Sequence, residues 1–300
     1  MIKNSGLKSG SKAELLLVFA TMMAGCGWIF SKQSIEGIPP FAFIGIRFVT
    51  ASLILMPLCL SALTQLAMRD VMKAAFAGLL QGVVLLLWIY SVSVTDALGE
   101  GAFIMSLSML FAPLMAWPLM KQKPGKCFWQ ALPVAVLGLY MLSGGGEWHT
   151  SASQITFLIA ALTLALQFNL NGLYVKSIPV LPLTCLQFLS TGLLAVLVSL
   201  LAESWPQSVD TSVWYWVCAS ILPATCLRFL AQIAGQKHTS ASNAAIIMIL
   251  EPLWTVMLSM TVYGEQMSFH KVTGCLLILT SLVVYKLRDR KRQRSGRLAG

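Results

Sequence analysis

Long apolar segments alternate with short polar breaks along the chain, and this pattern predicts a bundle of helices that cross a membrane. Most of the segments are close to the ~20 residues that a membrane-spanning helix needs, and the fifth and tenth are shorter. None has the roughly ten-residue polar/apolar alternation of an outer-membrane β-barrel, so we expect helices. The ten segments lie at residues 13–32, 41–63, 72–94, 99–120, 127–143, 153–175, 182–202, 212–235, 241–263 and 272–287.

Composition supports the same class. The residues AVILMFWYC make up 57% of the chain and charged residues only 11%, and the mean hydropathy is +0.77. A soluble domain typically has about 25% charged residues. We therefore expect an all-α integral membrane protein with ten transmembrane helices.

The distribution of basic residues predicts the orientation of these helices. With a cytoplasmic N-terminus, 17 Lys and Arg residues fall on cytoplasmic flanks and 3 on the opposite side. Cytoplasmic loops carry such an excess, so the bias predicts that both termini are cytoplasmic. The net charge is +10, but the basic run at residues 286–297 is more typical of a flank near anionic lipid than of a nucleic-acid site.

An internal repeat divides the chain into two halves. The stretch 102–113 aligns with 241–252, and Gly125 and Gly264 each lie twelve residues after the aligned proline. Because each half has five segments, the two copies must have opposite orientations, as in many secondary transporters. The expected parts are a cytoplasmic N-terminus at 1–12, a first repeat at 13–143, an external loop at 144–152, a second repeat at 153–287 and a basic cytoplasmic tail at 288–300.

Motifs for catalysis, metal binding or ATP binding are missing from the sequence. The seven cysteines are isolated and form no C-x-x-C pair, and the three histidines lie near predicted loops. No G-x-S-x-G, H-E-x-x-H or Walker A run occurs. We therefore expect neither an enzyme nor an ATP-driven pump, and no metal or cofactor. A cleaved signal peptide is not expected either, because the first segment is followed by Lys32 and further spans.

Several motifs resemble those of a known family. Trp28, Lys32, Pro40 and Arg47 fit a W-x3-K…P…R pattern, and a run of small residues leads to Leu-Glu-Pro at 250–252, with Gly-Glu at 264–265 before the last segment. Together with ten helices in two halves, they are similar to the EamA group of the drug/metabolite transporter superfamily over essentially the whole chain. The first half departs from the pattern with Gly-Lys at 125–126. The resemblance implies an inner-membrane carrier, often an exporter, with a central cavity lined mainly by helices 1, 3, 4, 6, 8 and 9.

Glu251 is the first candidate functional residue, because it is an ionisable side chain in the middle of the ninth segment. No other charge lies between Lys237 and Glu265. Burial disfavours the charged form of a carboxylate, so Glu251 could exchange a proton for substrate and act as the coupling group. The alternative is a structural ion pair with Arg228, which we expect at a similar depth in the eighth segment. Pro252 lacks a backbone donor and therefore loosens the helix at this point.

Arg228 offers a planar guanidinium that can bind a substrate carboxylate or phosphate. This role is compatible with a pair to Glu251, because a substrate anion could compete with that carboxylate. The other predicted substrate-binding residues are Trp28, Gln81, Trp88, Gln167, Asn171 and Gln232, each of which could instead serve only helix packing. Lys32 and Arg47 at the outer ends of the first two helices, and Lys176 on the cytoplasmic side, are predicted to guide an anion or to gate; the alternative is that they snorkel to the interface.

These features predict a multi-pass secondary transporter of the bacterial inner membrane. We expect an exporter of small metabolites, such as amino acids or related organic compounds, that works by alternating access around a central cavity. Proton antiport and uncoupled facilitation are both open. The alternative is a flippase or facilitator for a lipid-linked or amphipathic substrate. The expected partners are a small-molecule substrate and membrane lipid, with no nucleic acid, and the protein would be a monomer or a homodimer.

Overall fold

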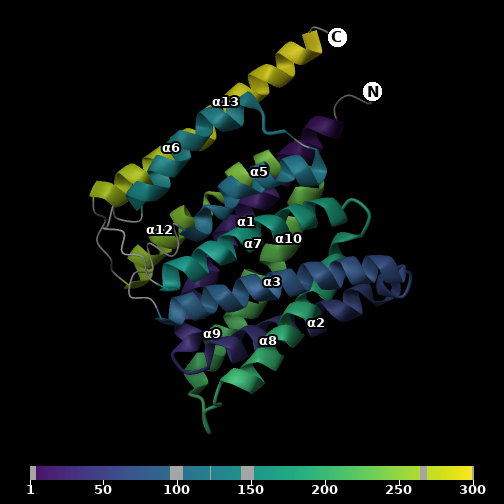
Figure 1. Ribbon diagram of the computed structural model, residues 1–300, viewed down its shortest axis with the longest axis vertical. Helices are drawn as coiled ribbons and strands as arrows, with labels where there is room; N and C mark the ends of the chain where they lie inside the picture. The colour runs from purple at the N-terminus through teal and green to yellow at the C-terminus, as the bar shows by residue number, and fades with distance from the viewer. Residues whose placement is uncertain (1–4, 95–103, 122, 143–151, 264–268, 299–300) are drawn as a thin grey trace.

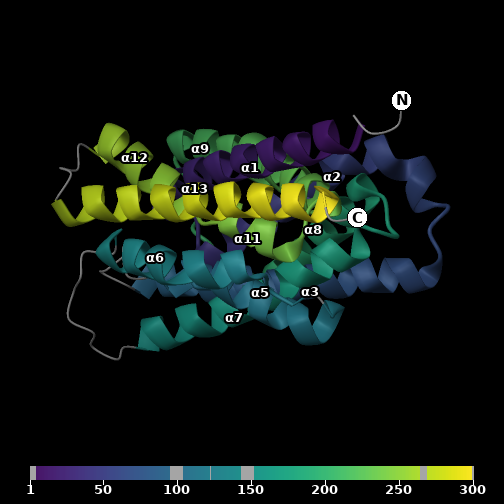
Figure 2. The ribbon, with the colours of Figure 1, turned by 90° about the horizontal axis from the view of Figure 1, so that it is seen from above.

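Most helices of the computed structural model run along one common direction (Figures 1 and 2). The structure describes residues 5–94, 104–121, 123–142, 152–263 and 269–298. Its helices are α1 (Ser5–Ile35), α2 (Pro40–Leu63), α3 (Met68–Val94), α5 (Ser108–Met120), α6 (Lys126–Leu142), α7 (Ala152–Tyr174), α8 (Val180–Ala202), α9 (Thr211–Ile221), the π-helical turn η1 (Leu222–Leu227), α10 (Arg228–Lys237), α11 (Ala241–Met248), α12 (Glu251–Tyr263) and α13 (Phe269–Leu298).

The prediction of an all-helical, multi-pass membrane protein is confirmed. Within the described residues there is no strand, and seven helical stretches are long and apolar enough to cross a membrane. Two shorter apolar helices lie at 104–120 and 272–285. The total of ten crossings, the inverted orientation of the halves and the side on which the termini lie stay predictions.

The helices pack mainly across the two halves of the chain. The helix α2 packs along α8, α3 lies against both α7 and α8, and α1 contacts α9, α10, α11 and α12. The helices α6 and α13 form a pair at one edge of the molecule (Figure 1). The start of α1 and the end of α13 lie at the same end of the bundle (Figure 2).

Glycines allow the closest of these helix crossings. A Cβ added at Gly192 of α8 would lie 2.6 Å from the backbone nitrogen of Val49 in α2. A Cβ added at Gly78 of α3 would lie 2.5 Å from the carbonyl oxygen of Gln187 in α8. Backbones in a membrane approach this closely only where a small residue lies at the crossing, so these positions require glycine.

Two acidic side chains bind backbone N–H groups at helix starts. The carboxylate of Glu203, just after α8, accepts hydrogen bonds from the backbone nitrogens of Phe41 and Ala42 at 2.8 and 2.9 Å. The start of α2 is thereby tied to the end of α8, where a negative charge also suits the helix dipole. Asp210 caps α9, and its hydrogen bonds with Ser212 lower the pKa of its carboxyl.

Of the prolines at residues 57, 113, 118, 133, 223 and 252, only two coincide with a break in regular α-helix. Pro223 lies in η1, and Pro252 follows the non-helical step at residues 249–250 between α11 and α12. The other four, at residues 57, 113, 118 and 133, lie inside helices α2, α5 and α6. Both breaks occur beside the cavity described next.

Candidate functional site

A cavity lies between helices from both halves of the chain. Its empty volume is about 1060 Å³, including space that opens to solvent. The helices α1, α2, α3, α7, α10 and α12 contribute to its wall, as do η1, α11 and the residues before and at the start of α5. The residues of α1 and α3 that line it belong to the second half of each helix, and those of α2 to the first half. The cavity therefore reaches from the middle of the bundle toward the end where α1 stops and α2 begins.

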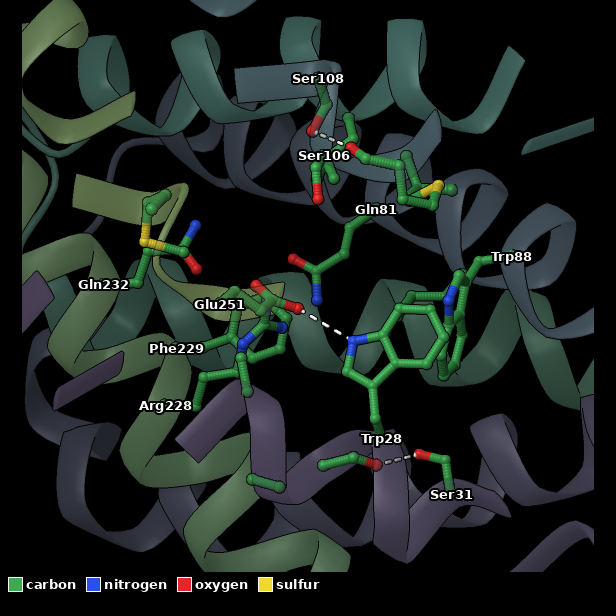
Figure 3. Close-up of a pocket in the computed structure, with 18 of the residues that line it drawn as sticks. Trp28, Ser31, Gln81, Trp88, Ser106, Ser108, Arg228, Phe229, Gln232 and Glu251 are labelled. Atoms are coloured by element: carbon green, nitrogen blue, oxygen red, sulfur yellow. Dashed lines mark hydrogen bonds and ion pairs between the residues drawn. The ribbon is translucent and has the colours of Figure 1, made fainter. Parts of the chain in front are cut away.

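Glu251 lies between Arg228 and Trp28 in this cavity (Figure 3). Its Oε2 is 3.5 Å from Nη2 of Arg228, and its Oε1 accepts a hydrogen bond from Nε1 of Trp28 at 3.1 Å. Glu251 is also the first residue of α12, where the helix dipole favours negative charge. The ion pair that the sequence offered as one interpretation is therefore present and joins α10 to α12. The hydrogen bond from Trp28 adds α1 to this junction.

The break before Pro252 explains how the carboxylate reaches a helix start. Residue 252 has no backbone N–H, so the carbonyl of Met248 loses its usual helical partner. The chain leaves α-helical geometry at residues 249–250, where the nitrogen of Leu250 donates to the carbonyl of Ile247 at 3.0 Å. The new helix starts at Glu251 and directs its first side chain into the cavity.

Arg228 is held by an aromatic ring as well as by Glu251. It is the first residue of α10, directly after η1, and its guanidinium carbon lies 4.4 Å from the centroid of the Phe229 ring. Its Nε is buried and has no hydrogen-bond partner among the described residues. Gln232, one turn further along α10, also lines the cavity, and its Oε1 is likewise buried without a partner.

The opposite wall combines aromatic rings and amides. Trp28 and Trp88 meet edge to face, with ring centroids 4.8 Å apart and an interplanar angle of 88°. Gln81 of α3 accepts a hydrogen bond from Nε2 of Gln167 in α7 at 3.1 Å, while its own Nε2 is buried without a partner in the described structure. The cavity thus has an apolar wall and unpaired polar atoms.

Arg47 is more buried within the protein than the sequence suggested. It is 6% exposed and lines the cavity, so the alternative that it snorkels to the membrane surface is wrong. Its Nη1 donates to Oγ of Ser31 at 3.0 Å, its Nη2 donates to the carbonyl of Ala224 at 2.9 Å, and its Nε donates to Oγ1 of Thr225. Ser31 and Thr225, which accept hydrogen bonds from Arg47, were missed by sequence reasoning, because they belong to other helical segments and only the fold brings them to Arg47.

Three predicted residues lie outside this cavity. Asn171 is buried and accepts a hydrogen bond from Nε2 of Gln187 in α8 at 2.5 Å. It shares a helix face with Gln167 but lies about 6 Å further along α7, where α7 meets α8 instead of the cavity. Lys176 lines a second, smaller pocket at the other end of the bundle, and Lys32 is an exposed residue near the end of α1. Of the predicted substrate-binding and coupling residues, the structure brings together Trp28, Gln81, Trp88, Gln167, Arg228, Gln232 and Glu251.

Apolar helices around a central cavity that holds a few polar and charged side chains are typical of a membrane transport protein. The chain belongs to the EamA-like transporter family, whose model matches it twice, at residues 11–144 and 152–286. It is 25% identical over 293 residues to an uncharacterized transporter of Archaeoglobus fulgidus, covering 96% of this chain and 91% of the relative. It is 22% identical to the uncharacterized transporter YvbV of Bacillus subtilis, with 94% of each chain covered.

A third relative and one solved structure agree with this assignment. The uncharacterized transporter YetK of Bacillus subtilis is 24% identical, with 97% of this chain and 92% of the relative covered. A solved crystal structure superposes with a TM-score of 0.78 at 16% sequence identity, over 94% of this chain and 98% of that one, and supports the fold alone. The protein is therefore a multi-pass membrane transporter.

Proposed function

We propose that the protein is a secondary transporter that exports small organic metabolites, such as amino acids or related compounds, by alternating access around the central cavity. The observation that carries this proposal is the junction of Arg228, Glu251 and Trp28. These residues come from three helices and meet in a cavity in the middle of the bundle. Pockets with apolar walls and a few convergent polar groups are typical ligand sites.

The unpaired polar atoms support substrate binding over a purely structural network. Buried polar groups are normally satisfied, and leaving one without a partner costs about 1–3 kcal/mol. Arg228 Nε and Gln81 Nε2 offer two donors and Gln232 Oε1 one acceptor. A substrate with a carboxylate and a hydrogen-bond donor would satisfy them, while Trp28 and Trp88 would cover its apolar part.

Glu251 is the proposed coupling residue. Protonation would weaken its ion pair with Arg228 and its hydrogen bond from Trp28 together. Proton binding and substrate binding at Arg228 would therefore affect each other, as coupling requires. If the carboxylate stays ionised throughout the cycle, the protein works as an uncoupled facilitator.

Counterflow in proteoliposomes tests both parts of the proposal. Labelled amino acids and related metabolites would be assayed with the wild type, with Glu251→Gln and with Glu36→Gln, which changes an exposed carboxylate outside the cavity. We expect a pH gradient to drive substrate transport by the wild type and by Glu36→Gln. The Glu251→Gln variant should exchange substrate at a rate that does not depend on the gradient. If the gradient changes transport by none of the three proteins, Glu251 has a structural role and does not couple transport to protons. If no compound exchanges, the transport proposal is contradicted.

A further inference from the structure

The charges that line the cavity do not cancel. Of the cavity-lining residues that the structure describes, three are charged: Arg47, Arg228 and Glu251. Arg228 and Glu251 form one neutral pair, at 3.5 Å. Arg47 is left as a second guanidinium, and arginine stays protonated in proteins. The described wall of the cavity therefore carries a net charge of +1.

The contacts of Arg47 orient its charge without neutralising it. Its hydrogen-bond partners among the described residues are two hydroxyls and one backbone carbonyl, all of them neutral. Its guanidinium carbon lies 5.7 Å from the ring centroids of both Phe43 and Phe48, and aromatic faces attract a cation but carry no net charge. Arg228 repels it. A buried charge of this kind needs a counter-charge, which the described wall does not supply.

A comparison within the chain indicates that the fold does not need this charge. Arg47 and Gln187 are each the eighth residue of a helix that follows a proline, in α2 and α8, and each is followed by a phenylalanine. Both donate hydrogen bonds to neighbouring helices, Arg47 to α1 and η1 and Gln187 to α7. A neutral amide fulfils the packing role in α8, so a packing role does not explain the guanidinium in α2.

We propose that the transported substrate is an organic monoanion, not a zwitterion or a cation. This inference rests on the proposed transport function and narrows its substrates to organic anions, which excludes the zwitterionic amino acids. The anionic group would lie against the free Nε of Arg228 and Nε2 of Gln81, and the apolar remainder against Trp28 and Trp88. Binding brings the charge of the described wall and ligand to zero. In a cell whose interior is negative, the membrane potential drives such a substrate outward, which agrees with export.

A set of four ligands that share a benzyl group and differ in charge state tests the inference on the unaltered protein. Purified wild type would be titrated calorimetrically with phenylacetate, phenylacetamide, phenethylamine and phenylalanine, which are an anion, a neutral amide, a cation and a zwitterion. We expect phenylacetate to bind at least about tenfold more tightly than the other three, because hydrogen bonds to charged groups are the stronger ones. Binding of any other member within threefold of phenylacetate, or no binding of phenylacetate, would overturn the inference.

Variants of Arg47 test the origin of the preference. Arg47→Gln, which copies the residue found in α8, should reduce the preference for phenylacetate over phenylacetamide to less than threefold. Arg47→Lys should retain it, and so should Arg69→Gln, which removes an exposed positive charge outside both pockets. A full preference in a folded Arg47→Gln variant contradicts the role of Arg47. If that variant does not fold, the titration of the wild type decides.

Transport under a clamped potential separates this inference from the proposed function. In proteoliposomes with a potassium gradient and valinomycin, phenylacetate should accumulate when the interior is positive, above the level of protein-free vesicles. If phenylalanine is transported as fast as phenylacetate, and its transport does not depend on the potential, the monoanion inference is wrong. The proposed transport function would still stand. Absence of transport for all four compounds, together with the counterflow panel, would count against the transport proposal itself.

Discussion

At the scale of single residues, the site is organised by the two oxygens of one carboxylate. Glu251 faces a guanidinium through one oxygen and an indole N–H through the other, at the start of a helix. Arg228 belongs to α10, Trp28 to α1 and Glu251 to α12, so this one carboxylate links three helices at the cavity.

The hydrogen bond from Trp28 can be measured with a double-mutant cycle. Trp28→Phe keeps an aromatic ring but removes the N–H, so it should lower the free energy of unfolding by about 1–3 kcal/mol. In a Glu251→Gln background the same change should cost less, because a neutral amide accepts a weaker hydrogen bond than a carboxylate. Unfolding of the four proteins in mixed micelles gives the coupling energy. Additive effects would mean that the indole N–H does not stabilise the carboxylate.

Sequence reasoning found the charged pair but not the surroundings of Arg47. Glu251 and Arg228 stand out as lone ionisable residues inside apolar segments, and their similar distances from the segment ends predict that they meet. Arg47 lies near the start of its helix, where a surface position was equally reasonable. Its acceptors Thr225 and Ala224 are 178 and 177 residues away in the chain, so only the tertiary structure could reveal its burial.

At the scale of helices, proline alone was a poor guide to where regular structure breaks. Pro57 lies inside an uninterrupted α2, whereas Pro223 coincides with a π-helical turn and Pro252 with a break. A proline loses one donor in every case, but neighbouring contacts decide how the helix responds. Here the two irregular segments present Arg228 and Glu251, and irregular backbone in membrane proteins is tolerated where it borders a cavity or other protein.

The glycines at helix crossings give a prediction about packing between helices. Gly78→Ala and Gly192→Ala should each destabilise the protein by about 1–3 kcal/mol, because the new Cβ would meet backbone atoms at 2.5 and 2.6 Å. Gly172→Ala is the matched control, since a Cβ there has no atom within 4 Å, and alanine is the better helix former. Thermal unfolding in detergent measures all three. An equal loss of stability in Gly172→Ala would show that general helix effects, not the crossings, are responsible.

At the scale of the whole molecule, hydropathy predicted the class of fold and the approximate helix bounds, because a span must be long and apolar wherever it lies. The arrangement of the helices was less accessible. That α3 packs closely on α8 depends on small residues such as Gly78 and Gly82, which do not stand out against an apolar background. The likeness between the halves suggested inverted repeats, and the double match of the family model supports a repeat without deciding its orientation.

The two pockets lead to a prediction about alternating access. The large cavity reaches toward the end where α1 stops, while the smaller pocket with Lys176 lies where α7 ends and α11 begins. Between them, α7 is tied to α5 by the hydrogen bond from Asn169 to the carbonyl of Ala112. A second tie to α10 comes from Gln236, which donates to the carbonyl of Phe168. We expect both hydrogen bonds to break when the smaller pocket connects to the centre.

Single cysteines in a cysteine-free background would report this change. Thr255→Cys lies in the large cavity, and Gly172→Cys lines the smaller pocket at a position with room for a side chain. With both termini cytoplasmic, an impermeant maleimide should reach residue 255 from outside and residue 172 only from the cytoplasm. A transported substrate should change the two labelling rates in opposite directions, because a carrier exposes its centre to one side at a time. Rates that rise or fall together, or labelling of both sites from one side, would contradict alternating access in this molecule.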